Sequence, residues 1–217
     1  MVIARHGRTA WHDRNRYTGR SDIPLDDTGV DQARALAEWA REFAPDLLFH
    51  SPMLRARQTS APIAEALDLP VRTDERLREL DFGSAEGLSL TDLDPEVARS
   101  FREDPVAHHF PGGEDPRVGA RRVTEWVHEV AEAHRGARVL VVAHNTLIRL
   151  LMCHVMGIPL SEYRRRLPGV DPTGLTRLRV EEGRVGLEAY NVPVLRSADR
   201  AGRGEQPMRP VDGPDTP

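Results

Sequence analysis

The sequence contains no lysine, one cysteine and no long hydrophobic run. All 30 basic residues are therefore arginine. We attribute this bias chiefly to a GC-rich genome, although the planar guanidinium group also suits bidentate binding of phosphate. The one cysteine, Cys153, cannot form an internal disulfide, and it follows three apolar residues at 150–152. This setting predicts a buried structural thiol rather than a nucleophile.

The longest apolar run, around residues 139–143, is far shorter than the roughly 20 residues that a membrane-spanning helix needs. No charged-then-apolar leader precedes the first motif. We therefore expect a soluble, cytoplasmic protein that binds no membrane. A net charge of -4 and a pI near 6.1 lack the strong basicity of nucleic-acid-binding domains, so we expect no nucleic acid as partner.

Apolar periodicity divides the 217 residues into alternating strands and helices. This alternation predicts an α/β fold, a three-layer α/β/α sandwich with a mostly parallel central sheet. We expect one catalytic domain over residues 1–195, followed by a disordered tail at 196–217 that is rich in Pro, Gly, Arg and Asp. The predicted strands are 2–4, 47–49, 69–71 and 139–143, with a hairpin of 175–180 and 185–190; the predicted helices are 30–40, capped by Asp27 or Thr28, then 56–67, 95–103, 117–135 and 147–156.

Three of these strands end at polar residues. His6 follows the first strand, His144 follows the fourth, and Arg55 stands shortly after the second. Ligands of parallel sheets bind beyond the carboxyl ends of the strands, so we expect these side chains to converge.

Four motifs in this order resemble the histidine phosphatase superfamily, or phosphoglycerate mutase-like family. They are Arg5-His6-Gly7-Arg8-Thr9, then Ser51 to Thr59 with Arg55 at its centre, then Glu79 before Asp81-Phe82-Gly83, and Val142-Ala143-His144. The resemblance covers about residues 2–193. It implies a sheet flanked by helices, which agrees with the fold expected from periodicity.

The resemblance also implies the roles of five catalytic residues. His6 attacks phosphorus and becomes phosphorylated, while the Gly7 carbonyl holds its other ring nitrogen. Glu79 protonates the leaving oxygen; Arg5, Arg55 and His144 bind the phosphoryl oxygens. These residue types fit the chemistry, because neutral imidazole is nucleophilic near pH 7 and guanidinium forks match phosphate oxygens.

Several further residues are expected to contact substrate. Thr18 and Gly19 lie in a stretch that resembles the substrate-binding loop of phosphoglycerate mutases. His12 stands where the family commonly has an asparagine that donates to phosphate. Asn145 replaces a common glycine, and Arg8 replaces an acidic residue or glutamine, which adds charge that favours a second anionic group on the substrate.

The sequence favours a phosphatase, a phosphoric monoester hydrolase of the histidine acid phosphatase type, with a small-molecule phosphomonoester as its substrate and no cofactor or metal. A mutase is the first alternative, although the segment after Glu79 lacks its Arg-His-Tyr and is shorter, with less material to exclude water. A non-catalytic phospho-ligand binding module is the second alternative, but none of the catalytic residues is lost. A metal hydrolase is the third alternative. His128 and His134 lie six residues apart on the expected helix, a spacing that does not place two ligands on one face. His108 and His109 are expected to line the substrate mouth or to be exposed. A homodimer is possible, since no sequence feature decides the oligomeric state.

Overall fold

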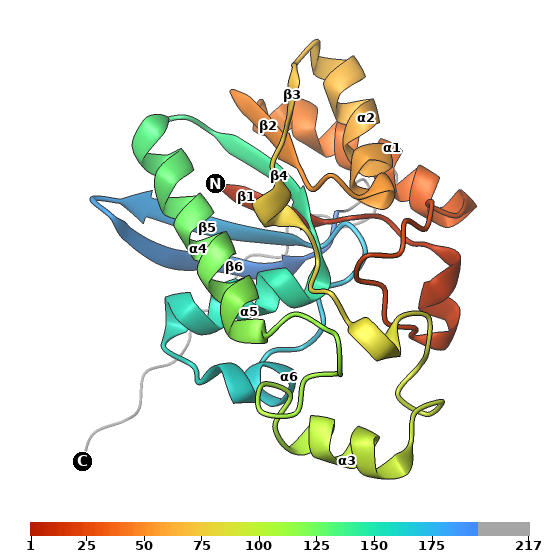
Figure 1. Ribbon diagram of the computed structural model, residues 1–217. Coiled ribbons are helices and arrows are strands. Elements are labelled where there is room, and N and C mark those ends of the chain that lie inside the picture. The colour runs from red at the N-terminus through yellow and green to blue at the C-terminus, as the bar shows by residue number, and fades with distance from the viewer. Residues whose placement is uncertain (195–217) are drawn as a thin grey trace, which may run out of the picture.

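The computed structural model describes residues 1–194, so the predicted tail at 196–217 lies outside the described residues. Six strands form one sheet in the order β3-β2-β4-β1-β5-β6. Pairs β1–β4, β4–β2 and β2–β3 are parallel, whereas β5 runs antiparallel to both β1 and β6. The predicted, mostly parallel sheet is confirmed, with the hairpin at one edge (Figure 1). The strands are β1 (Val2–Arg5), β2 (Leu47–His50), β3 (Val71–Thr73), β4 (Val139–Ala143), β5 (Leu175–Glu181) and β6 (Arg184–Val192).

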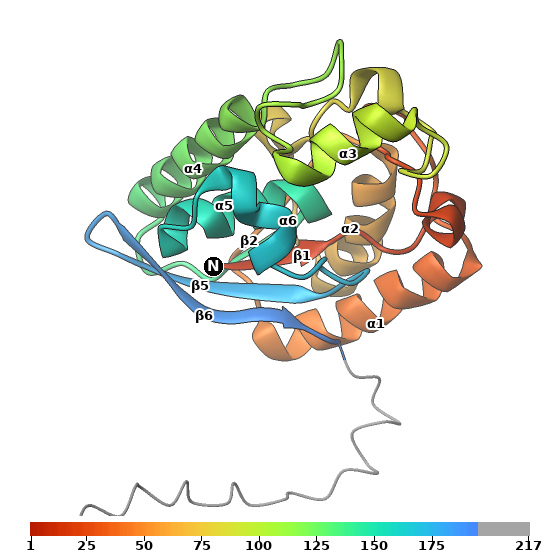
Figure 2. The same cartoon turned by 90° about the horizontal axis from the view of Figure 1, so that it is seen from below.

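Strand β4 shows why the sheet needs cover on both faces. All five of its residues are buried, and successive side chains point to opposite faces. Val139 and Val141 belong to the core that includes residues of α4 and α5, whereas Leu140 and Val142 belong to the core under α1 and α2. Figure 2 shows α1 on one side of the strands and α4 and α5 on the other. The sandwich therefore has two hydrophobic cores that share one sheet.

The helices begin and end close to the predicted positions. The N-cap of helix α1 is Asp26, one residue before the first of the expected caps, because the Asp26 carboxylate accepts the Gly29 N–H at 2.8 Å. Strand β3 starts later than predicted, at Val71, after Pro70, which has no N–H to donate. The α-helices are α1 (Asp27–Phe43), α2 (Leu54–Leu67), α3 (Pro95–Glu103), α4 (Pro116–Ala133), α5 (Asn145–Met156) and α6 (Tyr163–Arg166).

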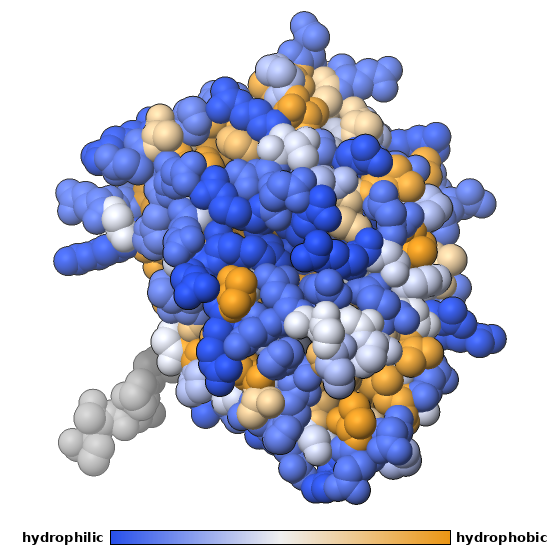
Figure 3. Space-filling view, viewed as in Figure 1, coloured by the Kyte–Doolittle hydropathy of each residue, from blue (hydrophilic) through white to orange (hydrophobic). Residues whose placement is uncertain are grey.

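Other features complete the described part of the chain. Cys153 is fully buried, and burial raises the pKa of its thiol to about 11, which confirms a structural residue. No helix within residues 1–194 has the length and hydrophobicity to cross a membrane. The surface in Figure 3 is largely hydrophilic, with an apolar group toward its lower right, on the side of α3. Leu88, which precedes α3, and Val97 of α3 are exposed large apolar side chains.

Candidate active site

Three neighbouring strands deliver the central residues of the site. His6 follows β1, His144 follows β4, and Ser51 follows β2. Because these strands pair in parallel, their carboxyl ends lie at one edge of the sheet. The ring centroids of His6 and His144 are 5.1 Å apart. The expected convergence of the two histidines is therefore present in the fold.

The His6 ring is held in one tautomer. Its Nδ1 lies 2.7 Å from the Gly7 carbonyl oxygen, which only accepts hydrogen bonds, so Nδ1 carries the proton and Nε2 is left with its lone pair. Burial and then the charge of Arg55 lower the pKa of His6 well below its ordinary value. A neutral imidazole with an unprotonated Nε2 is the form that can attack phosphorus.

Gly7 itself is fixed in place. Its N–H donates to Thr59 Oγ1 at 2.9 Å, and a Cβ at this position would lie 2.7 Å from the Gly29 carbonyl oxygen. Only glycine allows so close an approach of the two backbones. The carbonyl that orients His6 is thus held by α2 and by the first turn of α1.

Two buried arginines flank the histidines. Arg5 donates from Nη1 to the Val170 carbonyl and from Nη2 to His12 Nε2, both at 2.6 Å, and burial lowers its pKa to about 10. Arg55 is fully buried and donates to the carbonyls of residues 18, 19 and 21 at 2.9–3.0 Å. These bonds orient both guanidinium groups before any ligand arrives.

His144 is oriented by a serine to which the sequence analysis gave no role. Ser51 Oγ lies 2.7 Å from His144 Nε2 and also accepts the Met53 N–H at 3.3 Å. We assign the hydroxyl proton to the bond with Nε2, which makes Nδ1 the protonated nitrogen of the neutral His144 ring. The pKa of His144 is lowered well below its ordinary value, by burial first and by Arg55 next.

Three N–H donors in this cluster have no hydrogen-bond partner. Arg5 Nε, Arg55 Nε and His144 Nδ1 are all buried and unpaired in the described residues. A buried donor without a partner costs about 1–3 kcal/mol, so such groups in a native protein need an explanation. Beside a histidine with a free ring nitrogen, a set of donors of this kind suits the oxygens of a phosphoryl group.

Glu79 meets the amino end of α5. Its Oε1 accepts the N–H groups of Leu80 and Leu147 at 2.9 and 3.1 Å, and Oε2 accepts that of Thr146 at 2.9 Å. Burial raises the pKa of Glu79, while these N–H donors and Arg55 oppose the rise. Since Oε1 already accepts two hydrogen bonds, Oε2 is the oxygen with room for a proton.

A pocket of about 720 Å³ opens onto this cluster. Its walls include three of the residues expected to contact substrate: His12, Thr18 and Asn145. His12 Nε2 accepts from Arg5, and its pKa is lowered to about 4, by burial first and Arg5 next, so the neutral ring helps to orient Arg5. Asn145 Oδ1 accepts the Val170 N–H at 2.8 Å, and Thr18 Oγ1 donates to the Arg16 carbonyl.

Arg8 has two carboxylate partners in the structure. It does not line the pocket; it contacts the Asp13 carboxylate closely, and its Nε lies 3.5 Å from Asp26 Oδ2. Two local carboxylates thus hold and neutralise Arg8 outside the pocket wall, and its expected contact with substrate stays a prediction. Sequence position alone did not reveal these partners.

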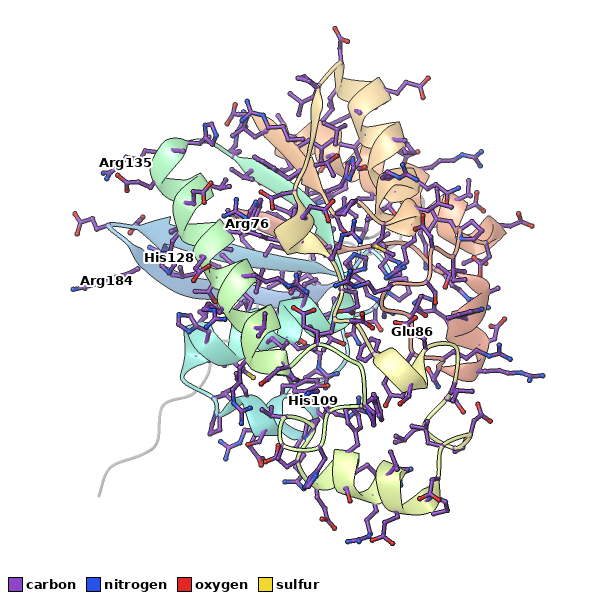
Figure 4. All side chains as sticks on the ribbon, in the orientation of Figure 1. Arg76, Glu86, His109, His128, Arg135 and Arg184 are labelled. Carbon is purple, nitrogen blue, oxygen red and sulfur yellow. The ribbon has the colours of Figure 1, made fainter. Side chains whose placement is uncertain are left out.

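Gly19 also lies outside the pocket wall, but the backbone explains why it is a glycine. A Cβ there would stand 2.1 Å from the Leu80 carbonyl oxygen and 2.3 Å from Glu86 Oε1. The Glu86 carboxylate accepts the N–H groups of Gly19, Arg20 and Ser21 at 2.8–3.3 Å. Figure 4 labels Glu86 close to the short helical turn at residues 83–85. Residues 18–21 are thus held between Glu86 on one side and Arg55 on the other.

Sequence reasoning missed the arginines that extend this pocket. Arg102, Arg149 and Arg164 line it, and they come from α3, α5 and α6. No motif marks them, and only the packing of these helices brings them together. His108 and His109 do not line it; His108 is exposed, and His109 Nδ1 donates to the Val106 carbonyl at 3.0 Å. Within residues 1–194, no three His, Cys, Asp or Glu side chains gather as a metal site.

A second hollow, of about 740 Å³, lies at the opposite end of the parallel strands, between α4 and the β5–β6 hairpin. Figure 4 labels His128, Arg135 and Arg184 around it. Arg135 is paired there with Glu132 at 2.5 Å. None of the predicted catalytic or substrate-binding residues lies in this hollow, so we place the candidate active site at the carboxyl ends of the strands.

The fold and the cluster together define an α/β protein whose candidate site combines two histidines with donors that suit a phosphoryl group. Comparison with known proteins agrees: residues 1–193 match the histidine phosphatase superfamily (branch 1). This chain belongs to that family, as the motifs predicted.

Individual relatives are similar over most of their length. Phosphoserine phosphatase 1 of Hydrogenobacter thermophilus is 30% identical over 195 residues, which are 88% of this chain and 92% of the relative. A probable phosphoglycerate mutase, GpmB of an Enterobacter species, is 33% identical over 168 residues, 76% of this chain and 78% of the relative. The solved structure of mycobacterial glucosyl-3-phosphoglycerate phosphatase has a TM-score of 0.81 at 28% identity and covers 89% of this chain and 99% of its own.

Proposed function

We propose that this protein is a phosphomonoesterase of the histidine acid phosphatase type, which hydrolyses a small soluble phosphate ester through a phosphohistidine at His6. The catalytic unit lies within residues 1–195. The observation that carries the proposal is the set of buried, unpaired N–H donors on Arg5, Arg55 and His144 beside the oriented His6 ring.

The first half-reaction forms the phosphoenzyme. His6 Nε2 attacks phosphorus as the bond to the ester oxygen breaks, and the three N–H donors bind the non-bridging oxygens on which charge accumulates. Glu79 passes its proton to the departing oxygen, and the alcohol leaves. The raised pKa of Glu79, which burial causes, supports this role because the acid must be protonated at the working pH.

The second half-reaction releases phosphate. Water attacks the phosphorus of phosphohistidine while the Glu79 carboxylate accepts a proton from the water. The bond between phosphorus and Nε2 breaks, its electron pair returns to Nε2, and inorganic phosphate leaves. His6 is then neutral and Glu79 is protonated, so the enzyme is ready for another cycle.

We propose that no metal ion takes part. A metal in other phosphatases clamps and neutralises the phosphoryl oxygens. Here two guanidinium groups and one imidazole already offer donors at that position, and each guanidinium is held by backbone carbonyls. In our proposal His12, Thr18 and Asn145 contact the bound substrate from the pocket wall, and His12 also keeps Arg5 in place.

The mutase alternative has one specific observation in its favour, the similarity to a protein named as a probable phosphoglycerate mutase. The relative named as a phosphoserine phosphatase covers more of this chain, 88% against 76%. A mutase must keep water from phosphohistidine, whereas a phosphatase must admit it. We therefore propose hydrolysis as the main reaction.

The test is phosphate release from a panel of phosphomonoesters that includes phenyl phosphate and 3-phosphoglycerate, with EDTA present. Isomerisation of 3-phosphoglycerate, with bisphosphoglycerate as primer, is measured in parallel. Quenching in alkaline detergent with a ³²P-labelled substrate detects the phosphoenzyme, because phosphate on histidine is stable in alkali and is lost in acid.

We expect phosphate release in EDTA and a labelled protein whose label disappears in His6→Ala. Isomerisation with negligible release would make the protein a mutase. Loss of all release in EDTA that added metal restores would overturn the metal-free mechanism, and silence in every assay would favour a binding module.

A further inference from the structure

The pocket is much larger than a phosphoryl group and carries an excess of positive charge. It holds about 720 Å³, and its only acidic wall residues are Glu79 and Asp171. The arginines of its wall are Arg5, Arg14, Arg16, Arg102, Arg149 and Arg164. Arg5 belongs to the proposed phosphoryl site, whereas the other five arginines have no role in the steps proposed above.

The pocket arginines gather around one cavity without carboxylate partners; in the part of the chain that the structure describes, some scattered surface arginines, such as Arg57 and Arg121, are also unpaired, whereas many others are paired. Arg76 pairs with Asp74 and Glu129, and Arg122 pairs with Glu114. By contrast, within residues 1–194 none of the pocket arginines has a carboxylate oxygen within 4.0 Å. Unpaired like charges around one cavity repel each other, and an anionic ligand would relieve that repulsion.

Two of the unpaired arginines are brought together where α3 meets α6. Arg165 of α6 donates to the carbonyls of Arg102 and Glu103 at the end of α3, at 3.4 and 3.0 Å. Arg164 lies over the ring of Phe101, with its guanidinium carbon 5.1 Å from the ring centroid. Figures 1 and 2 both show α3 beside α6. Arg102 and Arg164 are far apart in sequence, yet both line the same pocket.

Arg149 contacts the backbone on both sides of Arg164. Arg149 is 6% exposed, and its Nη2 donates to the carbonyls of Tyr163 and Leu167 at 3.0 and 2.8 Å. These two residues bracket Arg164 on α6. Arg149 also stacks on the Tyr163 ring at 4.9 Å, and its buried Nε has no partner. Arg149 thus holds the backbone on both sides of Arg164.

Resting on the proposed function, we infer that Arg102 and Arg164 form a subsite for a second oxyanion of the substrate, while the His6 site takes the phosphoryl group that is removed. The substrate class is a phosphomonoester whose alcohol part bears a carboxylate or another phosphate. Guanidinium forks bind both of these oxyanions through two parallel hydrogen bonds.

The experiment compares two pairs of substrates that differ by one anionic group. Phosphoserine and phosphoethanolamine differ in a carboxylate; the bisphosphate and monophosphate of propane-1,3-diol differ in a phosphate. We measure kcat and KM for the wild type, Arg102→Gln and Arg164→Gln. Arg166→Gln is the matched control, because this exposed arginine of the same helix pairs with Glu162 and does not line the pocket.

We expect the wild type to prefer the more anionic member of at least one pair by about tenfold or more in kcat/KM, the scale of one charge-assisted hydrogen bond. Arg102→Gln and Arg164→Gln should each reduce that preference severalfold, mainly through a higher KM, whereas Arg166→Gln should keep it. Preference in the serine pair identifies a carboxylate, and preference in the diol pair identifies a phosphate.

No preference in either pair, or an equal loss on both members in the arginine variants, would overturn the subsite. Circular dichroism checks that each variant folds. If Arg164→Gln does not fold, Arg102→Gln provides the test, because Arg102 is exposed. Phenyl phosphate keeps the two proposals separate: if it is hydrolysed and His6 is labelled while the preference is absent, only the subsite fails.

Discussion

Two histidines at neighbouring strand ends share nearly the same local geometry but lie in different surroundings. His6 follows β1 and His50 ends β2; each directs Nδ1 to the carbonyl of the next residue at 2.7 Å, and both are buried. Burial lowers the pKa of each. The difference is at Nε2, because His6 opens onto the arginine-rich pocket, whereas His50 Nε2 lies 3.4 Å from Thr73 Oγ1. A fixed tautomer is therefore not enough to make a nucleophile; donors for the phosphoryl oxygens must surround the free nitrogen.

The largest expected effect comes from removing the nucleophile. His6→Asn should lower kcat on phenyl phosphate by about 10⁴-fold or more, because removal of a covalent nucleophile costs several orders of magnitude. His6→Asn protein quenched in alkaline detergent should carry no ³²P, whereas the wild type should be labelled. A His6→Asn protein with wild-type turnover would show that the two histidines are not distinguished in the way proposed.

Glu79→Gln should have the next largest effect. We expect kcat/KM for alkyl phosphates to fall by about 10²–10⁴-fold, the usual contribution of a general acid, and to fall much less for p-nitrophenyl phosphate, whose leaving group needs no proton. Equal losses on both esters would argue against proton donation and for a purely structural role of Glu79 at the end of α5.

The pH profile tests the proposed protonation states of His6 and Glu79. Activity needs neutral His6 and protonated Glu79, so it should fall as pH drops through the lowered pKa of His6 and as pH rises through the raised pKa of Glu79. Glu79→Gln should lose the alkaline fall. Two esters with different phosphate pKa values identify any part of the profile that belongs to the substrate.

Ser51→Ala should give a smaller loss. Without the hydroxyl, His144 is free to carry its proton on Nε2 instead of Nδ1, and one donor to the phosphoryl group is then lost part of the time. We expect kcat to fall about tenfold, the scale of one hydrogen bond to a charged group, with little change in KM for substrate. A fall in thermal stability without a change in kcat would leave Ser51 a packing residue.

The smallest effect on activity is expected for His50→Gln. The amide retains polar groups near Ser51 and Thr73, and His50 does not line the pocket. We expect kcat/KM within about twofold of wild type and a loss of about 1 kcal/mol in the free energy of unfolding, measured by urea denaturation. A large loss of activity at normal stability would remove the contrast between the two histidines.

The sequence predicted the catalytic cluster better than the specificity pocket for a physical reason. His6 and His144 follow strands with strong apolar patterns, and the carboxyl ends of parallel strands meet at one edge. Arg102 and Arg164 line one pocket only because α6, too short to give a periodic pattern, packs against the end of α3. The carboxylate partners of Arg8 could not be predicted, because they come from loop geometry that periodicity does not describe.

The segment at residues 18–21 has a consequence for how such an enzyme can change during evolution. Glu86 accepts its N–H groups and Arg55 binds its carbonyls, so the main chain connects the anion to the cation, with one further hydrogen bond from Ser21 Oγ to Glu86 at 2.7 Å. The side chains of Thr18 and Arg20 take no part in this connection and are therefore free to vary without disturbing Arg55, which in our proposal faces the phosphoryl group. A lineage could exchange the alcohol it recognises while the apparatus for breaking the phosphorus–oxygen bond stays intact.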